Sequence, residues 1–197
     1  MFENLRRHLD SRVSISDSDF ELITQKIKVK RFKKKEMIAR ANEVADYQGY
    51  INSGSVRMFF TDDKGHEHVV QLSFEDWWTG DIMSFVTGQP ADYSIEALEE
   101  SELFLFQRDD METLYHAVPQ LERSFRILTQ NALVAMQQRM VANMSKSAEE
   151  RYLNLIKKFP HLELRIAQHH IASFLGITPE ALSRIKKSLI DKSKNAK

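Results

Sequence analysis

Apolar residues recur at helical spacing near both ends of the chain and alternate with polar residues in the middle. Phe2, Leu5 and Leu9 form one strip, and residues 16–19 offer a helix N-cap before Phe20, so the chain is expected to be helical to about residue 27. From residue 28 to 106, short β-prone runs are separated by turn residues, with strands expected at 93–98 and 103–107 and a hairpin turn at 63–65. This pattern predicts a β-sandwich or a barrel-like roll.

A long helix is predicted after Pro119 and should reach about residue 143. One strip of apolar positions on it comprises Leu121, Phe125, Leu128, Ala132 and Met136. A helix of this length often packs against its own copy, so these residues are candidates for a two-fold dimer seam. The alternative is that the helix only covers the β-roll. Residues 145–147 are typical of a hinge and cap, and a further helix is expected over 148–158, before Pro160.

The segment Gln168–Leu189 predicts two short helices around a tight turn. Ile171, Phe174 and Leu175 share one helical face, and Gly176 then ends that helix because glycine enters the left-handed conformation freely. Thr178 is a good N-cap, and Pro179 follows at the first helical position, where its missing N–H is not needed. This is the pattern of a helix-turn-helix.

The second of these helices has one apolar and one polar side. Leu182, Ile185 and Leu189 lie on the apolar side. The candidate DNA-contacting residues around the polar side and on the first helix are Thr178, Glu180, Ser183, Arg184, Lys186, Lys187 and His169. Such side chains can read base edges and phosphates in a DNA major groove. An ordinary helical hairpin in an all-α core is the alternative.

Charge is divided unevenly along the chain, although the net charge of the 197 residues is zero. Residues 1–118 carry 14 Lys+Arg and 22 Asp+Glu, a net −8, whereas residues 119–197 carry 14 and 6, a net +8. The basic part contains the predicted helix-turn-helix and is the part that would meet phosphates. Opposite charges could also hold the two parts together.

Composition excludes several classes of protein. With no cysteine there are no disulfides, thiolate metal sites or cysteine-ligated iron–sulfur clusters. No apolar run is long enough to span a membrane, and the N-terminus lacks the apolar segment of a signal peptide, so a cytoplasmic location is expected.

The order of β-roll, long helix, hinge and helix-turn-helix resembles the cyclic AMP receptor protein/fumarate–nitrate regulator (Crp/Fnr) family of bacterial transcription factors. Two motifs carry the resemblance: Ile171, Gly176, Glu180, Arg184 and Ile185 in the helix-turn-helix, and Gly80-Asp81-Ile82 followed by Ser94 and Ala97, similar to the family's phosphate-binding cassette.

The resemblance implies an α+β fold with an N-terminal double-stranded β-roll (1–118), a long dimerisation helix (119–144) and a C-terminal helix-turn-helix domain (145–197). It also implies a DNA-binding transcription regulator that acts as a homodimer on double-stranded DNA. The β-roll would sense a signal, and the long helix would transmit it. A small-molecule effector and RNA polymerase are further candidate partners, and the family's β-hairpin wing is expected to be absent.

The cassette departs from the pattern of the family's cyclic-nucleotide binders. Ser84-Phe85 stands in place of a Gly-Glu pair, and Tyr93-Ser94 in place of an Arg-Ser pair. A buried phosphate without a cationic partner is strongly disfavoured, so cyclic AMP is not expected to bind. The candidate effector pocket comprises Gly80, Asp81, Ser84, Phe85, Tyr93 and Ser94, to be filled by another small molecule or by its own aromatic residues with Trp77-Trp78.

A few residues also fit other functions. His66 and His68 alternate on a strand, as metal ligands of cupin enzymes do, but Glu75 lacks the usual cupin spacing. We therefore expect no metal, no cofactor and no catalytic constellation. The alternatives to a transcription regulator are a non-catalytic ligand-binding or protein-interaction module with a degenerate DNA-binding end, and a cupin-like metalloenzyme.

Overall fold

The computed structural model describes the backbone of residues 1–195 and the side chains of residues 1–192. In chain order the elements are α1 (Glu3–Asp10), α2 (Asp17–Gln25), β1 (Lys28–Phe32), β2 (Met37–Ala39), β3 (Tyr47–Ser53), β4 (Val56–Thr61), β5 (Glu67–Ser73), β6 (Trp78–Thr79), α3 (Ile82–Thr87), β7 (Ser94–Ala97), β8 (Ser101–Gln107), α4 (Arg108–Ala117), α5 (Pro119–Ser145), α6 (Ala148–Lys158), α7 (Leu162–Arg165), α8 (Gln168–Phe174) and α9 (Pro179–Asn195).

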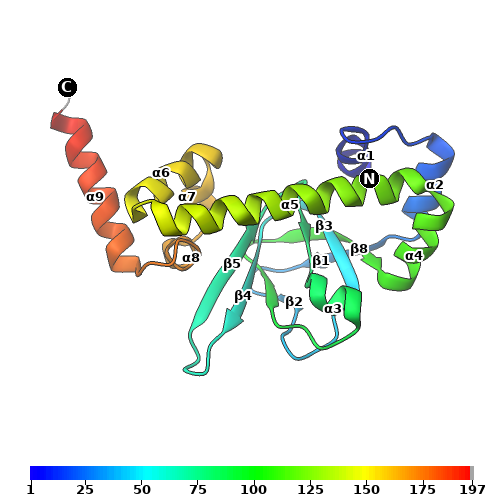
Figure 1. Cartoon of the computed structure of the whole chain (residues 1–197), viewed down its shortest axis with the longest axis horizontal. Coiled ribbons are helices and arrows are strands. Elements are labelled where there is room, and N and C mark those ends of the chain that lie inside the picture. Colours follow the sequence, from blue (N-terminus) through cyan, green and yellow to red (C-terminus); the bar gives the residue numbers. More distant parts are fainter. Residues whose placement is uncertain (196–197) are drawn as a thin grey trace.

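The strands form two antiparallel four-stranded sheets, in the orders β1-β8-β3-β6 and β2-β7-β4-β5. Their facing sides enclose a core cluster that includes Ile51, Met58 and Ile95. The predicted β-roll is thereby confirmed. Figure 1 shows the long helix α5 running past the roll, with α1, α2 and α4 near one end and α6–α9 at the other.

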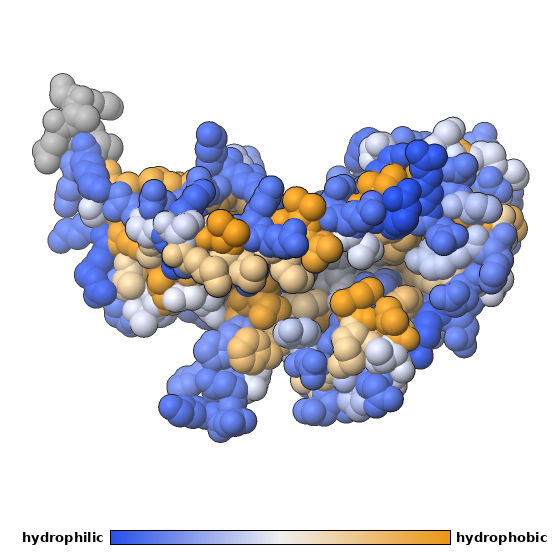
Figure 2. Space-filling view, in the orientation of Figure 1, coloured by the Kyte–Doolittle hydropathy of each residue, from blue (hydrophilic) through white to orange (hydrophobic). Residues whose placement is uncertain are grey.

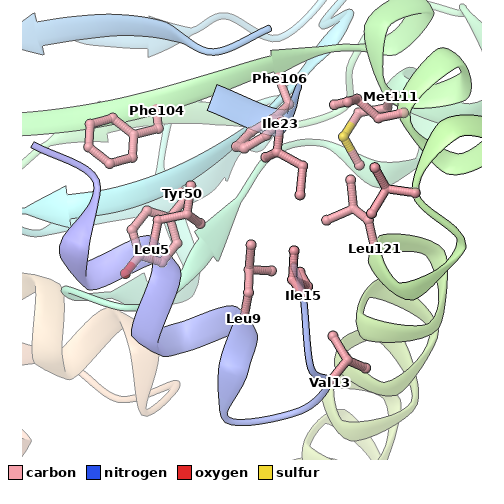
Figure 3. Packing of buried hydrophobic residues seen from close by; sticks show 12 residues of the cluster. Leu5, Leu9, Val13, Ile15, Ile23, Tyr50, Phe104, Phe106, Met111 and Leu121 are labelled. Carbon is pink, nitrogen blue, oxygen red and sulfur yellow. The ribbon is translucent and has the colours of Figure 1, made fainter. Parts of the chain in front are cut away.

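A second core cluster lies between the outer face of the first sheet and the helices at the N-terminal end of α5. Tyr50 of β3 and Phe104 and Phe106 of β8 face Leu5 and Leu9 of α1 (Figure 3). Leu121, at the start of α5, is fully buried in the same cluster. These contacts attach the first turns of α5 to the roll of their own chain.

Local capping explains where the C-terminal helices begin. Ser147 and Glu150 form a capping box at the start of α6, which satisfies N–H groups that have no partner inside the helix. Lys146 before it is extended, so the chain turns between α5 and α6 as the predicted hinge requires.

The third core cluster crosses from the second sheet to the C-terminal helices. It contains Phe59, Val69, Leu72, Phe74 and Leu98 of the roll. From the C-terminal helices it contains Tyr152, Leu162, Ile166, Ile171, Ala172, Leu175 and Leu182. The segment after Ser145 therefore packs on the roll and is not an isolated unit.

Candidate nucleic-acid interface and cassette

The helix-turn-helix is built around Gly176. Its φ is 68°, while a Cβ atom there would meet nothing within 4 Å, so backbone conformation and not crowding favours glycine. The N–H of Ile177 bonds to the carbonyl of Ala172 at 3.0 Å, and the Thr178 hydroxyl accepts from the N–H of Ala181 at 3.2 Å. The turn and the cap predicted from the sequence are both present.

Helix α9 has one side in the protein and one in solvent. Leu182 is buried, and Ile185 and Leu189 pack against the same cluster. Thr178, Glu180, Ser183, Arg184 and Lys187 are exposed, and His169 is exposed on α8. The structure thus brings most of the predicted DNA-contacting side chains to solvent at one end of the molecule.

Lys186 of α9 is only partly exposed, and its charge is paired within the chain. Its Nζ lies 2.6 Å from Glu163 Oε1, and Glu163 also accepts a hydrogen bond from the Tyr152 hydroxyl at 2.8 Å. This pair connects α9 to α7 and α6, and the role of Lys186 as a phosphate contact remains a prediction. Periodicity placed it near the polar side, but the neighbouring carboxylate already engages its charge.

Glu180 and Arg184 are neighbours one turn apart on the exposed side of α9. The pKa of Glu180 is lowered by its own backbone N–H, then by the Thr178 hydroxyl, and also by the charge of Arg184. Glu180 is therefore an anion beside a cation. The pair can accept one hydrogen bond from a base amino group and donate two to a guanine edge.

Three main-chain N–H groups of the cassette bind a carboxylate of the chain itself. Asp81 is 1% exposed, and its carboxylate accepts from the N–H groups of Ser84 (2.9 Å), Asp92 (3.0 Å) and Tyr93 (3.2 Å). A second anion would lose these donors and would be repelled by Asp81. Arg108 is near, but it donates to the carbonyls of Ser84 and Phe85.

Other polar groups of the cassette are also engaged internally. The Ser84 hydroxyl accepts from the N–H of Ala45 at 2.9 Å and donates to the carbonyl of Gln89 at 2.6 Å. Ser94 accepts from the N–H of Ala41 at 3.0 Å. The loop around α3 is thus closed by its own hydrogen bonds.

The aromatic residues expected to fill one pocket divide between different places. Tyr93 and Trp77 pack with the core between the sheets, together with Tyr47, whose pKa is raised to about 12 mainly by burial. Phe85 and Trp78 pack in the cluster outside the first sheet. The assignment of Phe85 to the effector pocket remains a prediction.

The predicted dimer seam on α5 is contradicted at its first two positions and remains a prediction at the other three. Leu121 is fully buried in its own chain, and Phe125 packs on Trp78 with ring centroids 4.5 Å apart. Leu128 is half-buried, whereas Ala132 and Met136 are exposed. The first turns of α5 thus face the roll, which is the alternative weighed from the sequence.

Farther along α5 a different apolar strip is exposed. Leu133, Met136, Met140 and Met144 are 54%, 69%, 55% and 81% exposed, and they follow one another three or four residues apart. Figure 2 shows hydrophobic residues along this part of the helix. Such a strip is the type of surface that a second helix covers.

The histidine pair on the β4–β5 hairpin makes local contacts only. The Asp62 carboxylate lies 2.9 Å from His68 Nε2 and 3.5 Å from His66 Nδ1. Glu75, the carboxylate considered with them, instead pairs with Arg165. Across residues 1–192, no group of three or more His, Asp or Glu side chains is arranged to hold a metal ion.

Four residues with important contacts were not singled out from the sequence: Arg57, Arg139, Arg165 and Ser173. All four lie where the roll meets the C-terminal helices. One signal was available for Arg139, which is the only charged residue between positions 127 and 145. A lone charge in an uncharged helix segment indicates a specific partner.

Comparison with known proteins gives consistent similarities. The family described as "Cyclic nucleotide-binding domain" matches residues 29–117. A probable transcriptional activator of Rhizobium leguminosarum bv. viciae is 28% identical over 76% of this chain and 65% of its own length. The transcriptional activator protein Anr of Pseudomonas protegens is 23% identical over 88% of this chain and 75% of its own length.

The fold is shared with solved structures. FixK2 from Bradyrhizobium japonicum superposes with a TM-score of 0.75 at 20% identity, covering 85% of this chain and 86% of that one. Among the described residues, none of the helices has the length and apolar character needed to cross a membrane.

Proposed function

We propose that this chain, which belongs to the Crp/Fnr family, is a DNA-binding transcription regulator with a cyclic-nucleotide-binding-like domain, and that it acts as a homodimer. It recognises double-stranded DNA through α9 and acts in the cytoplasm, where that DNA lies. Contact with RNA polymerase and a small-molecule effector are further parts of this proposal. The protein has no catalytic role in it.

The observation that carries the proposal is the two-sided character of α9. Its apolar side is held by Leu182, while Glu180, Ser183, Arg184 and Lys187 remain exposed. Arg184 would donate to a guanine and Glu180 would accept from a cytosine amino group. Lys187 and His169 would contact phosphates and give affinity without sequence preference.

A dimer would repeat these contacts on an inverted repeat. The exposed strip of Leu133, Met136, Met140 and Met144 supports pairing through the C-terminal half of α5. Two recognition helices related by a two-fold axis would then enter major grooves about 34 Å apart. Half-site spacing is therefore a geometric consequence of the proposal.

The cassette supports a regulator that does not respond to cyclic AMP. Phe85 and Tyr93 stand where the family's cyclic-nucleotide binders have a Glu and an Arg, and the nearby N–H groups are bonded to Asp81. Two-state regulation requires only a ligand or partner that binds one dimer arrangement more tightly than another. The effector would therefore be a molecule other than a cyclic nucleotide.

Selection of bound fragments from random-sequence DNA tests the function. The purified full-length protein should enrich an inverted repeat, and affinity should fall steeply as salt rises. The Arg184→Ala variant is the matched control, because it should lose the preference at one base position in each half-site. Enrichment of no sequence by wild-type protein, at low and moderate salt, would refute DNA recognition.

A further inference from the structure

Strand β5 is an edge strand, and its outer edge is covered by helices from the C-terminal half of the chain. β5 stands last in the order β2-β7-β4-β5. We call its outer edge, residues 67–70, the β5 docking edge. Unpaired strand edges need other partners for their N–H and C=O groups, and here those partners are side chains.

Ser173 of α8 acts as one such partner. Its hydroxyl accepts from the N–H of Val69 at 2.9 Å and donates to the carbonyl of Glu67 at 3.3 Å. Val69 is 4% exposed, so its N–H has little access to water as a replacement acceptor. The first helix of the helix-turn-helix is thus hydrogen-bonded to the main chain of the roll.

Arg139 of α5 bonds to the main chain of β5 at the next residue, Val70, where the register between β4 and β5 shifts. It donates to the carbonyl of Val70, and its guanidinium lies 4.6 Å from the centre of the Phe174 ring of α8. Among the described residues no carboxylate pairs with it, and burial lowers its pKa. A half-buried charge without an anion is costly, so the carbonyl and the ring are its compensation.

Arg165 forms the third attachment, at the end of α7. Its two terminal nitrogens bond to the two oxygens of Glu75 at 2.8 and 2.7 Å, and its Nε bonds to Glu99 at 3.0 Å. Glu75 is also held by the N–H of Gly54 at 2.9 Å. A bidentate pair fixes direction as well as distance, so α7 cannot rotate freely on the roll.

His170 of α8 makes a further contact with a side chain of the roll. Arg57 of β4 is 7% exposed at its side chain, pairs with Glu67 and Glu96 at 2.5 Å each, and lies 3.4 Å from His170 Nδ1. Burial, and then the charge of Arg57, lower the pKa of His170 to about 4. The imidazole is therefore neutral where it faces this cation.

We propose that the β5 docking edge and the pairing of Arg165 with Glu75 and Glu99 together set the position of the recognition helix, with Ser173, Arg139 and Arg165 as positioning residues. A signal that shifts β4 and β5 would reach DNA through α8 directly, in addition to any movement of α5. The docked arrangement leaves Glu180 and Arg184 exposed, so it is compatible with base contact. The inference rests on the proposed DNA-binding function.

Docking of the C-terminal helices on the roll should affect binding to a full inverted repeat and binding to a single half-site differently. One half-site needs only one recognition helix, so the position of that helix relative to the partner's recognition helix does not matter there. An inverted repeat needs two recognition helices at a set separation, which the docking edge would preorganise. Loss of docking should therefore weaken binding to the full site and leave binding to a single half-site nearly unchanged.

Ser173→Ala is the main test, because alanine suits a helix and removes only the hydroxyl. On the full inverted repeat its affinity should fall about tenfold, the effect expected from one buried hydrogen bond. On DNA with one half-site scrambled, the change should stay below about threefold. Ser145→Ala is the matched control, since that hydroxyl bonds to Val141 of its own helix.

Lys187→Ala should behave differently from Ser173→Ala. It removes a phosphate contact, so it should weaken full-site and half-site binding by the same factor per half-site. Arg165→Ala and Glu75→Ala should each resemble Ser173→Ala, and their combination should be less than additive because they remove one interaction. Equal losses on full and half-sites for Ser173→Ala, or no loss on either, would overturn the inference.

Hydrogen exchange of the DNA-free protein separates this inference from the proposed function. In Ser173→Ala the amide of Val69 should exchange faster than in wild type, with little change in β8 at the centre of the other sheet. Unchanged exchange at Val69 would contradict docking even if DNA binding is confirmed. Faster exchange in a protein that selects no DNA would support docking while refuting the function.

Discussion

A charged substitution in the exposed strip of α5 should separate the dimer. Met140→Glu places a carboxylate in the middle of the strip formed by Leu133, Met136, Met140 and Met144. In a two-fold dimer the change occurs twice, and the two new charges lie near one another. The strip contacts water in the single chain and would be buried in the dimer. The substitution would mainly remove the contribution of this apolar burial to the free energy of association.

The magnitude follows from the exposed fractions. Full burial of a Leu or Met side chain contributes about 1.5–3 kcal/mol, so side chains that are 54–81% exposed would each contribute roughly 1–2 kcal/mol on association. Four residues in two copies give about 8–16 kcal/mol, comparable to the 4–15 kcal/mol cost of association. Met140→Glu removes roughly 2–4 kcal/mol, which corresponds to about a 30- to several-hundred-fold weaker dimer.

Sedimentation over a concentration series measures this effect. Asn131→Glu is the control, because position 131 is exposed and lies about 200° around the helix from Leu133. It should leave the dimer unchanged, and circular dichroism should show that both variants remain folded. A wild-type protein that is monomeric at micromolar concentration would refute the reasoning, as would equal weakening by the two substitutions.

Three further outcomes are expected. Calorimetric titration with cyclic AMP or cyclic GMP should give no binding heat, because Tyr93 and Phe85 replace the Arg and Glu that hold the phosphate and ribose in the family's cyclic-nucleotide binders; a micromolar dissociation constant would contradict this. Arg184→Ala should cost about 1–3 kcal/mol per half-site and relax one base preference, whereas Lys187→Ala should weaken all sequences alike; unchanged preference in Arg184→Ala would show that the docking on DNA is misassigned. Stability should fall as pH drops from about 6.5 toward 4, because burial lowers the pKa of His8 and His170 to about 4 and the unfolded chain takes up their protons first. Urea unfolding at pH 7 and pH 5 measures this loss of stability. His8→Gln and His170→Gln should each make the free energy of unfolding depend less on pH. A pH dependence in both variants that equals that of the wild type would count against this explanation.

Local chemistry is what the sequence by itself determined. Gly176, Thr178 and Pro179 each have one strongly preferred backbone role, so the helix-turn-helix could be predicted from a few adjacent residues. The β-roll followed from the alternation of short strands and turns. The departures from the cyclic-nucleotide cassette at Phe85 and Tyr93 were also visible, because an absent Arg or Glu requires no coordinates to recognise.

Which surface meets which was decided only by the tertiary structure. Periodicity showed that Leu121 and Phe125 share a side of α5, but it could not say that the chain's own roll covers that side. The same limit applies to Lys186, whose charge is engaged by Glu163 across two helices.

The β5 docking edge shows this limit most clearly. Ser173, Arg139 and Arg165 come from three different helices, and their partners lie 66–106 positions away along the chain. Hydrogen bonds and ion pairs between such distant segments leave no periodic trace in a single sequence. Spacing records the preferences of neighbouring residues, whereas contacts between the roll and the C-terminal helices arise only when the whole chain packs.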